Sequence, residues 1–356
     1  MKAATTATNA TASTRVEVVM LTGTHTRSGF IPHGRYAARR AVFNRPKCPA
    51  SHSVLQGRVR PRKRSSEPLA LLRLLAPVGH RGQACAVIVD AHVHLHPDRL
   101  AEAIRRWFDA HAWNIQYRSG VDEDVRTLVA GGVDRMVALP YVHRPGLARA
   151  LNDFTLDVFR RHPEVLPCCT VFPGEEGAED ILEQALSGAF RGVKIHSHVM
   201  KIAPDDPRLD AVWRASARWR KPVVIHCGPE PALPGYGVDP RAVSGADRLQ
   251  RALDRHPDAI AVVPHLGFDD TPRFEAMLPT YPNLYLDTTM VVGGYFERQP
   301  DVDVLRRHPD RILYGTDFPN IPYEWDRELR AVRAMHLPAE DEAKILAENA
   351  LRLFGA

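Results

Sequence analysis

Two histidines separated by one residue stand at the end of the first strongly apolar run of the chain. The run covers Val87–His94 and ends with His92 and His94. Alternate side chains of a β-strand point to the same face, so we expect both imidazoles to reach one ion. Two histidines supply half of the ligands of a usual zinc-type site, and the others must come from elsewhere in the chain.

Three later apolar runs also end in a side chain that can bind a metal. They end at His226, His265 and Asp317, each of which is followed two residues later by Gly or Pro. If these runs are strands of a closed parallel barrel, their carboxyl ends meet around the barrel axis. Three neutral imidazoles and one carboxylate that leave a position open for water are typical of a catalytic metal site. The pattern therefore predicts a metal-dependent enzyme.

The elements that must position these residues alternate regularly along the chain. After residue 85, short apolar runs recur, and each is followed by a stretch long enough for a helix. The runs cover residues 86–94, 133–142, 165–172, 192–199, 222–227, 260–266, 284–288 and 312–317. Strands that alternate with helices pair in parallel through right-handed crossovers, and eight such units close into a (β/α)8 TIM barrel. An open doubly wound sheet is the alternative, but no Gly-x-Gly-x-x-Gly turn follows the first run.

Three copies of Arg-His-Pro precede expected strands. Their histidines are His162, His256 and His308. In each copy a basic helix end meets a proline that stops the helix. We therefore expect these histidines at the rim of the barrel opposite the catalytic end.

The first eighty residues differ from the rest in composition. Residues 1–80 hold 14 Lys and Arg but only Glu17 and Glu67, so the remaining chain is acidic although the whole carries a formal charge of +5. We interpret residues 1–84 as a disordered, low-complexity leader and residues 85–356 as the barrel domain. A transit peptide, a nucleic-acid-binding tail and a start assigned too far upstream are the three explanations for the leader.

The composition also limits the class of protein and its partners. A hydrophobic content of 44% can fill a large core, and no run approaches the roughly 20 apolar residues of a membrane helix. The acidic composition of the barrel does not favour binding to nucleic acid, so we expect its partner to be a small molecule. Assembly into a homo-oligomer is also possible. Five cysteines without framework spacing favour a cytoplasmic protein, or an organelle if the leader is a transit peptide.

Five segments of the chain together resemble the amidohydrolase superfamily. They are Asp90-Ala-His92-Val-His94, Gly192-Val-Lys194-Ile-His196, Ile225-His226-Cys-Gly228, Pro264-His265-Leu-Gly267 and Tyr314-Gly-Thr-Asp317-Phe-Pro319. The chain is most similar to the amidohydrolase-related branch, which also holds aminocarboxymuconate-semialdehyde-type decarboxylases. The resemblance covers residues 86–356 and none of the leader.

This resemblance implies a ligand set and a chemistry. By likeness to the family, His92, His94, His226 and Asp317 would hold one divalent metal, usually zinc, and His265 would assist the bound water or polarise the substrate. A divalent ion lowers the pKa of its water from ~15.7 towards ~7, and Asp317 and His265 can then move protons as general base and acid. The expected function is a metal-dependent hydrolase of a small polar substrate. The alternative is a non-oxidative decarboxylase or hydratase of an unsaturated or aromatic acid.

Lys194 leaves the number of metals open. In several branches of the superfamily a fourth-strand lysine is carboxylated and bridges two metals, whereas one-metal members use the lysine for substrate binding. We favour one metal, with Lys194, His196 and Tyr236 as candidate substrate-binding residues.

Overall fold

The chain divides into two units, Met1–Ala84 and Cys85–Ala356. A computed structural model describes residues 87–230 and 233–355. The expectations for the leader lie outside the described residues.

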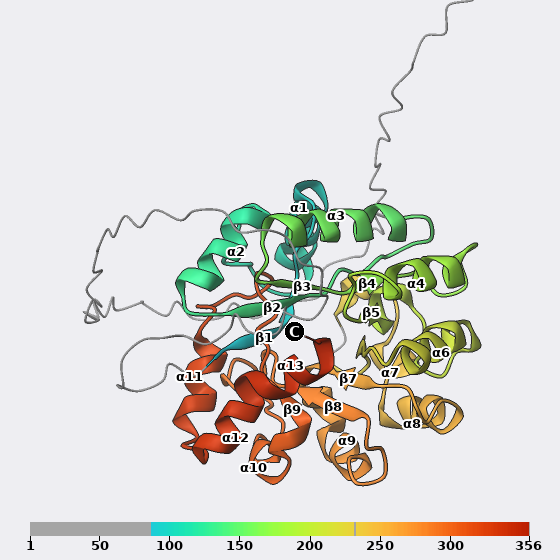
Figure 1. Cartoon of the computed structure of the whole chain (residues 1–356). Helices are drawn as coiled ribbons and strands as arrows, with labels where there is room; N and C mark the ends of the chain where they lie inside the picture. Colours follow the sequence, from blue (N-terminus) through green and yellow to red (C-terminus); the bar gives the residue numbers. More distant parts are fainter. Residues whose placement is uncertain (1–86, 231–232, 356) are drawn as a thin grey trace, which may run out of the picture. The chain divides into compact units, whose positions relative to one another are not determined.

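Parallel strands form a closed ring, which confirms the predicted TIM barrel (Figure 1). The strands are β1 (Val89–Val93), β2 (Arg135–Ala138), β3 (Val165–Pro167), β4 (Cys169–Thr170), β5 (Val193–His196), β6 (Val223–His226), β7 (Ala261–Val263), β8 (Leu284–Asp287) and β9 (Ile312–Leu313). Strands β3 and β4 are separated only by Cys168 and occupy one barrel position, because β3 pairs with β2 and β4 with β5. The ring closes where the Ala91 amide donates to the Tyr314 carbonyl at 2.8 Å.

Helices surround this ring and connect its strands. They are α1 (Asp98–His111), α2 (Val121–Ala130), α3 (Ala148–Arg161), α4 (Ala178–Leu186), α5 (Ser197–Met200), α6 (Asp210–Trp219), α7 (Pro240–Val243), α8 (Ala246–Arg255), α9 (Thr271–Met277), α10 (Val304–Arg307), α11 (Arg327–Ala334), α12 (Ala339–Ala343) and α13 (Asn349–Phe354). Each predicted run contains an observed strand, but the run 192–199 ends too late. Helix α5 begins at Ser197, so His198 lies on a helical turn and not on the strand that the run predicted.

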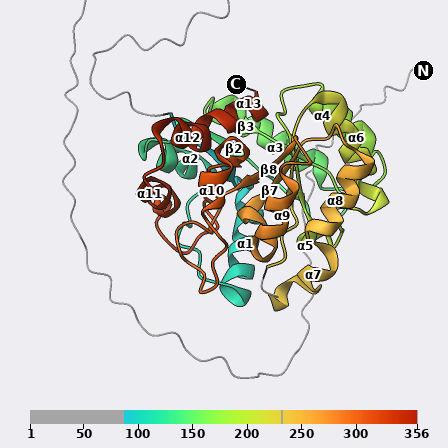
Figure 2. The same ribbon diagram turned by 90° about the horizontal axis from the view of Figure 1, so that it is seen from below.

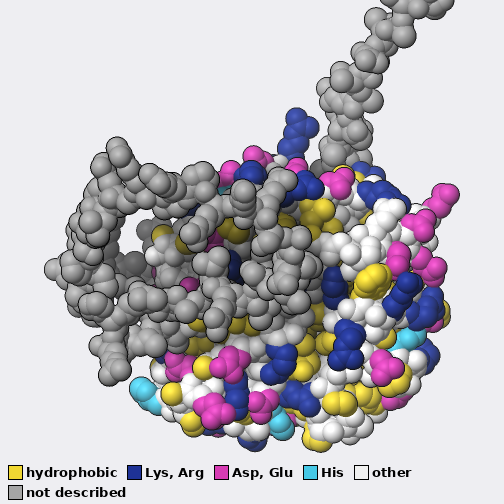
Figure 3. Space-filling view, in the orientation of Figure 1, with side chains coloured by type: hydrophobic (Ala, Val, Ile, Leu, Met, Phe, Trp, Pro, Cys, Tyr) yellow, Lys and Arg dark blue, Asp and Glu magenta, His cyan; other side chains and the backbone are white. Residues whose placement is uncertain are grey.

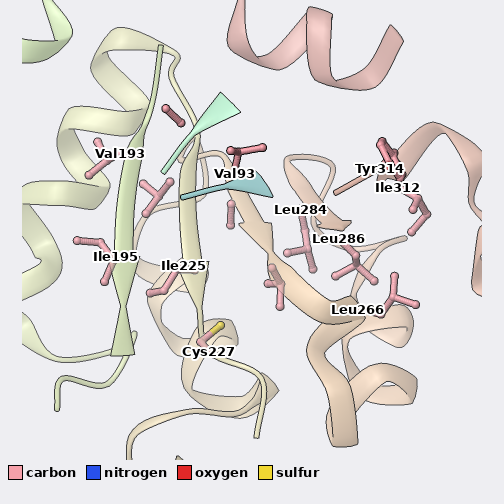
Figure 4. Close-up of a cluster of buried hydrophobic side chains, with 14 of the residues drawn as sticks. Val93, Val193, Ile195, Ile225, Cys227, Leu266, Leu284, Leu286, Ile312 and Tyr314 are labelled. Carbon is pink, nitrogen blue, oxygen red and sulfur yellow. The ribbon is translucent and has the colours of Figure 1, made fainter. Parts of the chain in front are cut away.

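Apolar side chains form two clusters, one between the strands and the outer helices and one inside the ring of strands. Between the strands and the outer helices, Val193 and Ile195 point to the same side of β5, as Figure 4 shows. A second cluster inside the ring contains Val224, Val262 and Leu313. Adjacent cysteines Cys168 and Cys169 belong to the inner and the outer cluster respectively, as expected for neighbours on a strand.

The C-terminal segment closes one end of the barrel. Its residues Ala347, Ala350, Leu353 and Phe354 pack into the inner cluster. Figure 2 places α12 and α13 at one end of the molecule and α7 at the other. Because α7 follows the carboxyl end of β6, the closed end is the one opposite the predicted ligands.

The Arg-His-Pro histidines lie at helix ends and pair with carboxylates. His162 lies 2.7 Å from Asp122, and His256 lies 3.0 Å from Asp210. The third, His308, lies 3.1 Å from Glu275. In each case the carboxylate comes from a preceding outer helix, so these histidines tie neighbouring helices together.

The outer surface carries mixed charge. On the face shown in Figure 3, Lys and Arg are interspersed with Asp and Glu over the helices. Among residues 87–230 and 233–355, no helix is long and apolar enough to cross a membrane.

Truncation of Phe354 tests the role of the C-terminal segment. We expect Phe354→Ala to lower the free energy of unfolding of the barrel by about 3–5 kcal/mol, because a ring is removed from a closed core. Urea unfolding measures the change. The control is Val129→Ala on α2, whose side chain is 39% exposed and whose loss should cost no more than about 0.5 kcal/mol. Equal, small losses in both variants would show that the segment does not close the barrel.

Candidate active site

The carboxyl ends of the strands bring three of the four predicted metal ligands into one buried group. His94 Nε2 lies 3.0 Å from Asp317 Oδ1, and His92 Nε2 lies 3.4 Å from the same oxygen. One ligand atom from each of these three residues lies within 4.8 Å of the others. His92 is fully buried, and His94 and Asp317 are 5% and 8% exposed. The expected juxtaposition of the opening histidines and Asp317 is therefore present.

Hydrogen bonds on the outer side fix which nitrogen of each imidazole faces the centre. His92 Nδ1 donates to Asp287 Oδ2 at 2.8 Å, and His94 Nδ1 donates to the Leu139 carbonyl at 2.9 Å. His265 Nδ1 donates to the Thr289 carbonyl at 2.9 Å. A carboxylate and a carbonyl only accept, so each outer nitrogen carries the proton and each inner Nε2 carries a lone pair.

Two of these inner lone pairs, those of His94 and His265, face other acceptors. The lone pair of His94 Nε2 is directed at the Asp317 carboxylate, and His265 Nε2 lies 3.3 Å from His226 Nδ1. Acceptors that face each other at such distances need a proton or a cation between them. The donor set of imidazole nitrogens and one carboxylate suits a divalent transition metal, and this accounting shows that the residues present fit one.

His226 belongs to a neighbouring group with His196 and His198. Its Nδ1 faces His265, and its Nε2 lies 3.4 Å from Glu230 Oε2. Three of the four expected ligands thus share one group, and the fourth adjoins it through His265. The role of His226 as a ligand stays a proposal.

The second histidine group does not have the geometry of a metal site. The rings of His196 and His226 are stacked, with centroids 4.1 Å apart and planes 9° from parallel. Nitrogen lone pairs lie in the ring plane, so two parallel stacked rings cannot aim at one ion. The count of one metal, which the sequence analysis favoured, stays a prediction.

Burial sets the protonation of the site. It lowers the pKa of His226 to about 3 and that of His92 well below 6.5. Burial alone would raise the pKa of Asp317, but the contact with His94 and the nearby His92 and His265 outweigh it and lower the pKa below its usual range. At neutral pH His92 and His226 are therefore neutral and Asp317 is ionised, which are the forms that bind a metal.

Lys194 lies behind His92 rather than in the open cavity. Its Nζ is 3.4 Å from His92 Nε2, and the side chain is fully buried. Burial lowers the pKa of Lys194 to about 8, against the attraction of Asp287 and Asp317. This amine contacts the metal group directly and does not line the cavity described next.

A cavity of about 280 Å³ opens above the histidines. Its floor contains His94, His196, His226, His265 and Asp317. Its walls are mainly aromatic and apolar: Phe108, Trp113, Tyr141, Tyr236, Phe268, Met290, Tyr295 and Phe296. Among the described lining residues, Glu230 and Asp317 are the only ones with a fixed charge. The candidate residues His196 and Tyr236 thus line the cavity.

Two site residues escaped the sequence analysis. Asp287 ends β8, and its Oδ1 also accepts from the His265 amide at 2.9 Å. It could have been found, because it is another ligand-type side chain at the end of an apolar run. Glu230 carries no such signal, because it lies in a Pro-rich loop after β6.

Glu328 holds the loop that supplies Tyr295 and Phe296. This fully buried side chain accepts from the amides of Val292 and Gly293 at 2.9 and 2.8 Å. The aromatic wall is therefore anchored from α11 behind it.

Local backbone strain coincides with the catalytic candidates. His265 and Asp317 have φ values of 58° and 70°, in the left-handed region that costs a non-glycine residue roughly 1–3 kcal/mol. The backbone after β7 and after β9 is therefore strained at these two residues, and the surrounding structure must stabilise it.

The chain matches the amidohydrolase family model over residues 89–356, and it therefore belongs to the amidohydrolase family. A comparison with curated proteins finds no match.

Solved structures share the fold at low sequence identity. The 5-carboxyvanillate decarboxylase of Sphingomonas paucimobilis is 18% identical, with a TM-score of 0.55 over 76% of this chain and 99% of that enzyme. The 2,6-dihydroxybenzoate decarboxylase of Rhizobium is 19% identical, with a TM-score of 0.54 over 76% and 98%. The 5-carboxyvanillate decarboxylase of Novosphingobium aromaticivorans, solved with manganese and a nitrobenzoic acid, is 17% identical, with a TM-score of 0.57 over 76% and 98%.

The buried amine of Lys194 should make stability depend on alkaline pH. Its pKa is about 8 in the folded protein and 10.5 in the reference state, so between these values the unfolded chain binds more protons. The free energy of unfolding of the metal-free protein should therefore rise by up to about 3 kcal/mol between these pH values. Lys194→Met should lack that rise and should be the more stable protein at pH 7.

Urea unfolding with a chelator present, repeated across this pH range, measures the effect. The control is Lys201→Met, since Lys201 is exposed and should leave the pH dependence of the wild type intact. A parallel pH dependence in wild type and Lys194→Met would contradict the buried amine.

Proposed function

We propose that this protein is a metal-dependent, non-oxidative decarboxylase of an aromatic carboxylic acid. The observation that carries the proposal is a cavity whose floor is built from tethered histidines and Asp317 and whose walls are aromatic. Flat aromatic walls favour a planar ring, and the floor suits a carboxylate held at a metal. Two solved structures similar in fold are named as decarboxylases of aromatic acids, which supports this reading over hydrolysis.

One divalent ion would be held by His92, His94, His226 and Asp317. When bound, it would supply positive charge that attracts the substrate carboxylate and polarises it. Zinc is the ion expected from the family resemblance, and manganese is the ion present in the Novosphingobium enzyme. Both accept nitrogen and carboxylate ligands.

The protein's own residues would orient the ring and deliver one proton. Trp113, Tyr236 and Phe296 would pack against the ring, and His196 would contact it from the floor. His265 is tethered through Nδ1, so its Nε2 faces the cavity. Once Nε2 has taken up a proton from solvent, the imidazolium can deliver that proton to the ring carbon that bears the carboxylate. The bond from that carbon to the carboxylate then breaks, its electron pair returns to the ring, and carbon dioxide leaves. His265 regains the proton from solvent.

Asp317 suits the role of a metal ligand better than that of the proton donor. Its pKa is held below the usual range by His94 and His92 against the effect of burial, so the acid form is scarce at neutral pH. The sequence analysis expected Asp317 and His265 to move protons as general base and acid, and in the proposed decarboxylation the proton donor is His265.

Hydrolysis by metal-activated water was the main expectation from the sequence, and the same side chains could support it. The two reactions differ in their products. A decarboxylase releases carbon dioxide and retains the ring, whereas a hydrolase consumes water and releases an acid, amine or ammonia.

Metal dependence is tested with His94→Ala. We expect the purified wild type to hold one divalent ion per chain, and we expect His94→Ala to lose it together with at least about 10²-fold in activity. Metal content by mass spectrometry of the elements and activity after reloading with Zn²⁺ or Mn²⁺ are the measurements. His162→Ala is the control, because His162 pairs with Asp122 at the far rim. Full activity in the chelated wild type would rule the proposal out.

The reaction class is tested with a panel of hydroxylated benzoic acids, aryl amides and esters. We expect carbon dioxide from the acids, and we expect His265→Ala to lower kcat by about 10²–10⁴-fold while the metal is retained. Released carbon dioxide and ammonia are measured separately. Release of ammonia or acid from the amides or esters, with no carbon dioxide from the acids, would favour the hydrolase.

A further inference from the structure

We propose that Glu230 is a positioning residue that selects the tautomer of His226 and thereby presents His226 Nδ1 to the metal. This inference rests on the proposed function, which makes His226 a ligand. It concerns a residue that no strand end supplies, since Glu230 lies in the loop between β6 and α7.

His226 differs from the other imidazoles of the centre in the group that its second nitrogen contacts. The other imidazoles of the centre are tethered to a strand carboxylate or to backbone carbonyls, through Asp287, Leu139 and Thr289. Among the described residues, no strand carboxylate or backbone carbonyl holds His226 in this way. Its Nε2 faces Glu230 Oε2 at 3.4 Å, and its Nδ1 faces His265 at 3.3 Å.

The chemistry of a carboxylate then decides the tautomer. A carboxylate accepts and does not donate, so the proton of a neutral His226 belongs on Nε2 and the lone pair on Nδ1. The lone pair is thereby directed toward His265 and the centre. Without Glu230, nothing in these contacts would stop the proton from residing on Nδ1, where it would block the metal.

Glu230 is itself held from the other side. Its Oε1 accepts from His198 Nδ1 at 2.8 Å, and His198 is fully buried on α5. Tyr236, from the cavity wall, lies close to Glu230, and burial together with this carboxylate raises the pKa of the Tyr236 hydroxyl. His198 therefore fixes one carboxylate oxygen, which leaves the other for His226.

Stacking restrains the ring as well as the proton. His196 lies flat against His226, with centroids 4.1 Å apart, so the ring of His226 cannot tilt without losing this contact. Glu230 and His196 together define the plane and the tautomer of His226. A carboxylate behind a ligating histidine is a general device, and its removal typically weakens metal binding about 10–100-fold.

The first test reads the tautomer directly in metal-free protein. Long-range ¹H–¹⁵N correlation spectra of ¹⁵N-histidine protein, assigned with His226→Gln, should show His226 protonated on Nε2 in the wild type. In Glu230→Ala the proton should move to Nδ1 or be shared between the nitrogens. Glu176→Gln, an exposed carboxylate in the loop before α4, is the matched control and should leave the spectrum unchanged.

The second test measures affinity for Zn²⁺ by competition with a chelator. Glu230→Ala should bind Zn²⁺ about 10–100-fold more weakly, and Glu230→Gln, which keeps an acceptor oxygen, should lose less than about tenfold. His198→Phe, which removes the donor that holds Glu230, should lie between the wild type and Glu230→Ala. Circular dichroism of each variant checks that the barrel is intact.

These outcomes separate the inference from the proposed function. A wild type that binds no divalent metal would end the proposed function, while the spectra would still decide the tautomer. An unchanged His226 tautomer in Glu230→Ala, or a Zn²⁺ affinity of Glu230→Ala within about twofold of wild type, would overturn the role of Glu230.

Discussion

The site depends on one constraint, which is that a buried imidazole must place its single proton against an acceptor. At this barrel mouth the acceptors lie on the outer side, as the Asp287 carboxylate and the carbonyls of Leu139 and Thr289. The protons therefore point outward and the lone pairs point inward, toward Asp317. The arrangement is costly for an empty polar pocket and favourable around a cation.

The barrel supplies this constraint through its architecture. The strands end at the same edge of the ring, so residues 225 positions apart in sequence, His92 and Asp317, meet there. The opposite end is closed by the C-terminal segment, whose apolar side chains pack into the inner cluster. The apolar packing that stabilises the barrel and the residues of the candidate site therefore lie at opposite ends. The loops after the strands can shape the cavity without disturbing the core.

The cavity wall and the metal group are joined by a short chain of contacts. Tyr236 lines the cavity, lies close to Glu230 and packs near Trp107, with ring centroids 5.0 Å apart. Glu230 in turn contacts His226. A side chain that lines the cavity is therefore two contacts away from a proposed ligand, which makes the loop after β6 part of the site rather than a cover for it.

The sequence by itself determined the barrel, the polarity of its strands and the cluster of His92, His94 and Asp317, because alternation and strand-end position are local properties of the chain. It misjudged where β5 ends, since α5 begins at Ser197 and takes His198 off the strand. Only the tertiary structure decided that Lys194 lies behind His92, that His196 stacks on His226, and that Glu230 bonds to His198. Those relations depend on ring planes and loop paths, which no spacing in the sequence encodes.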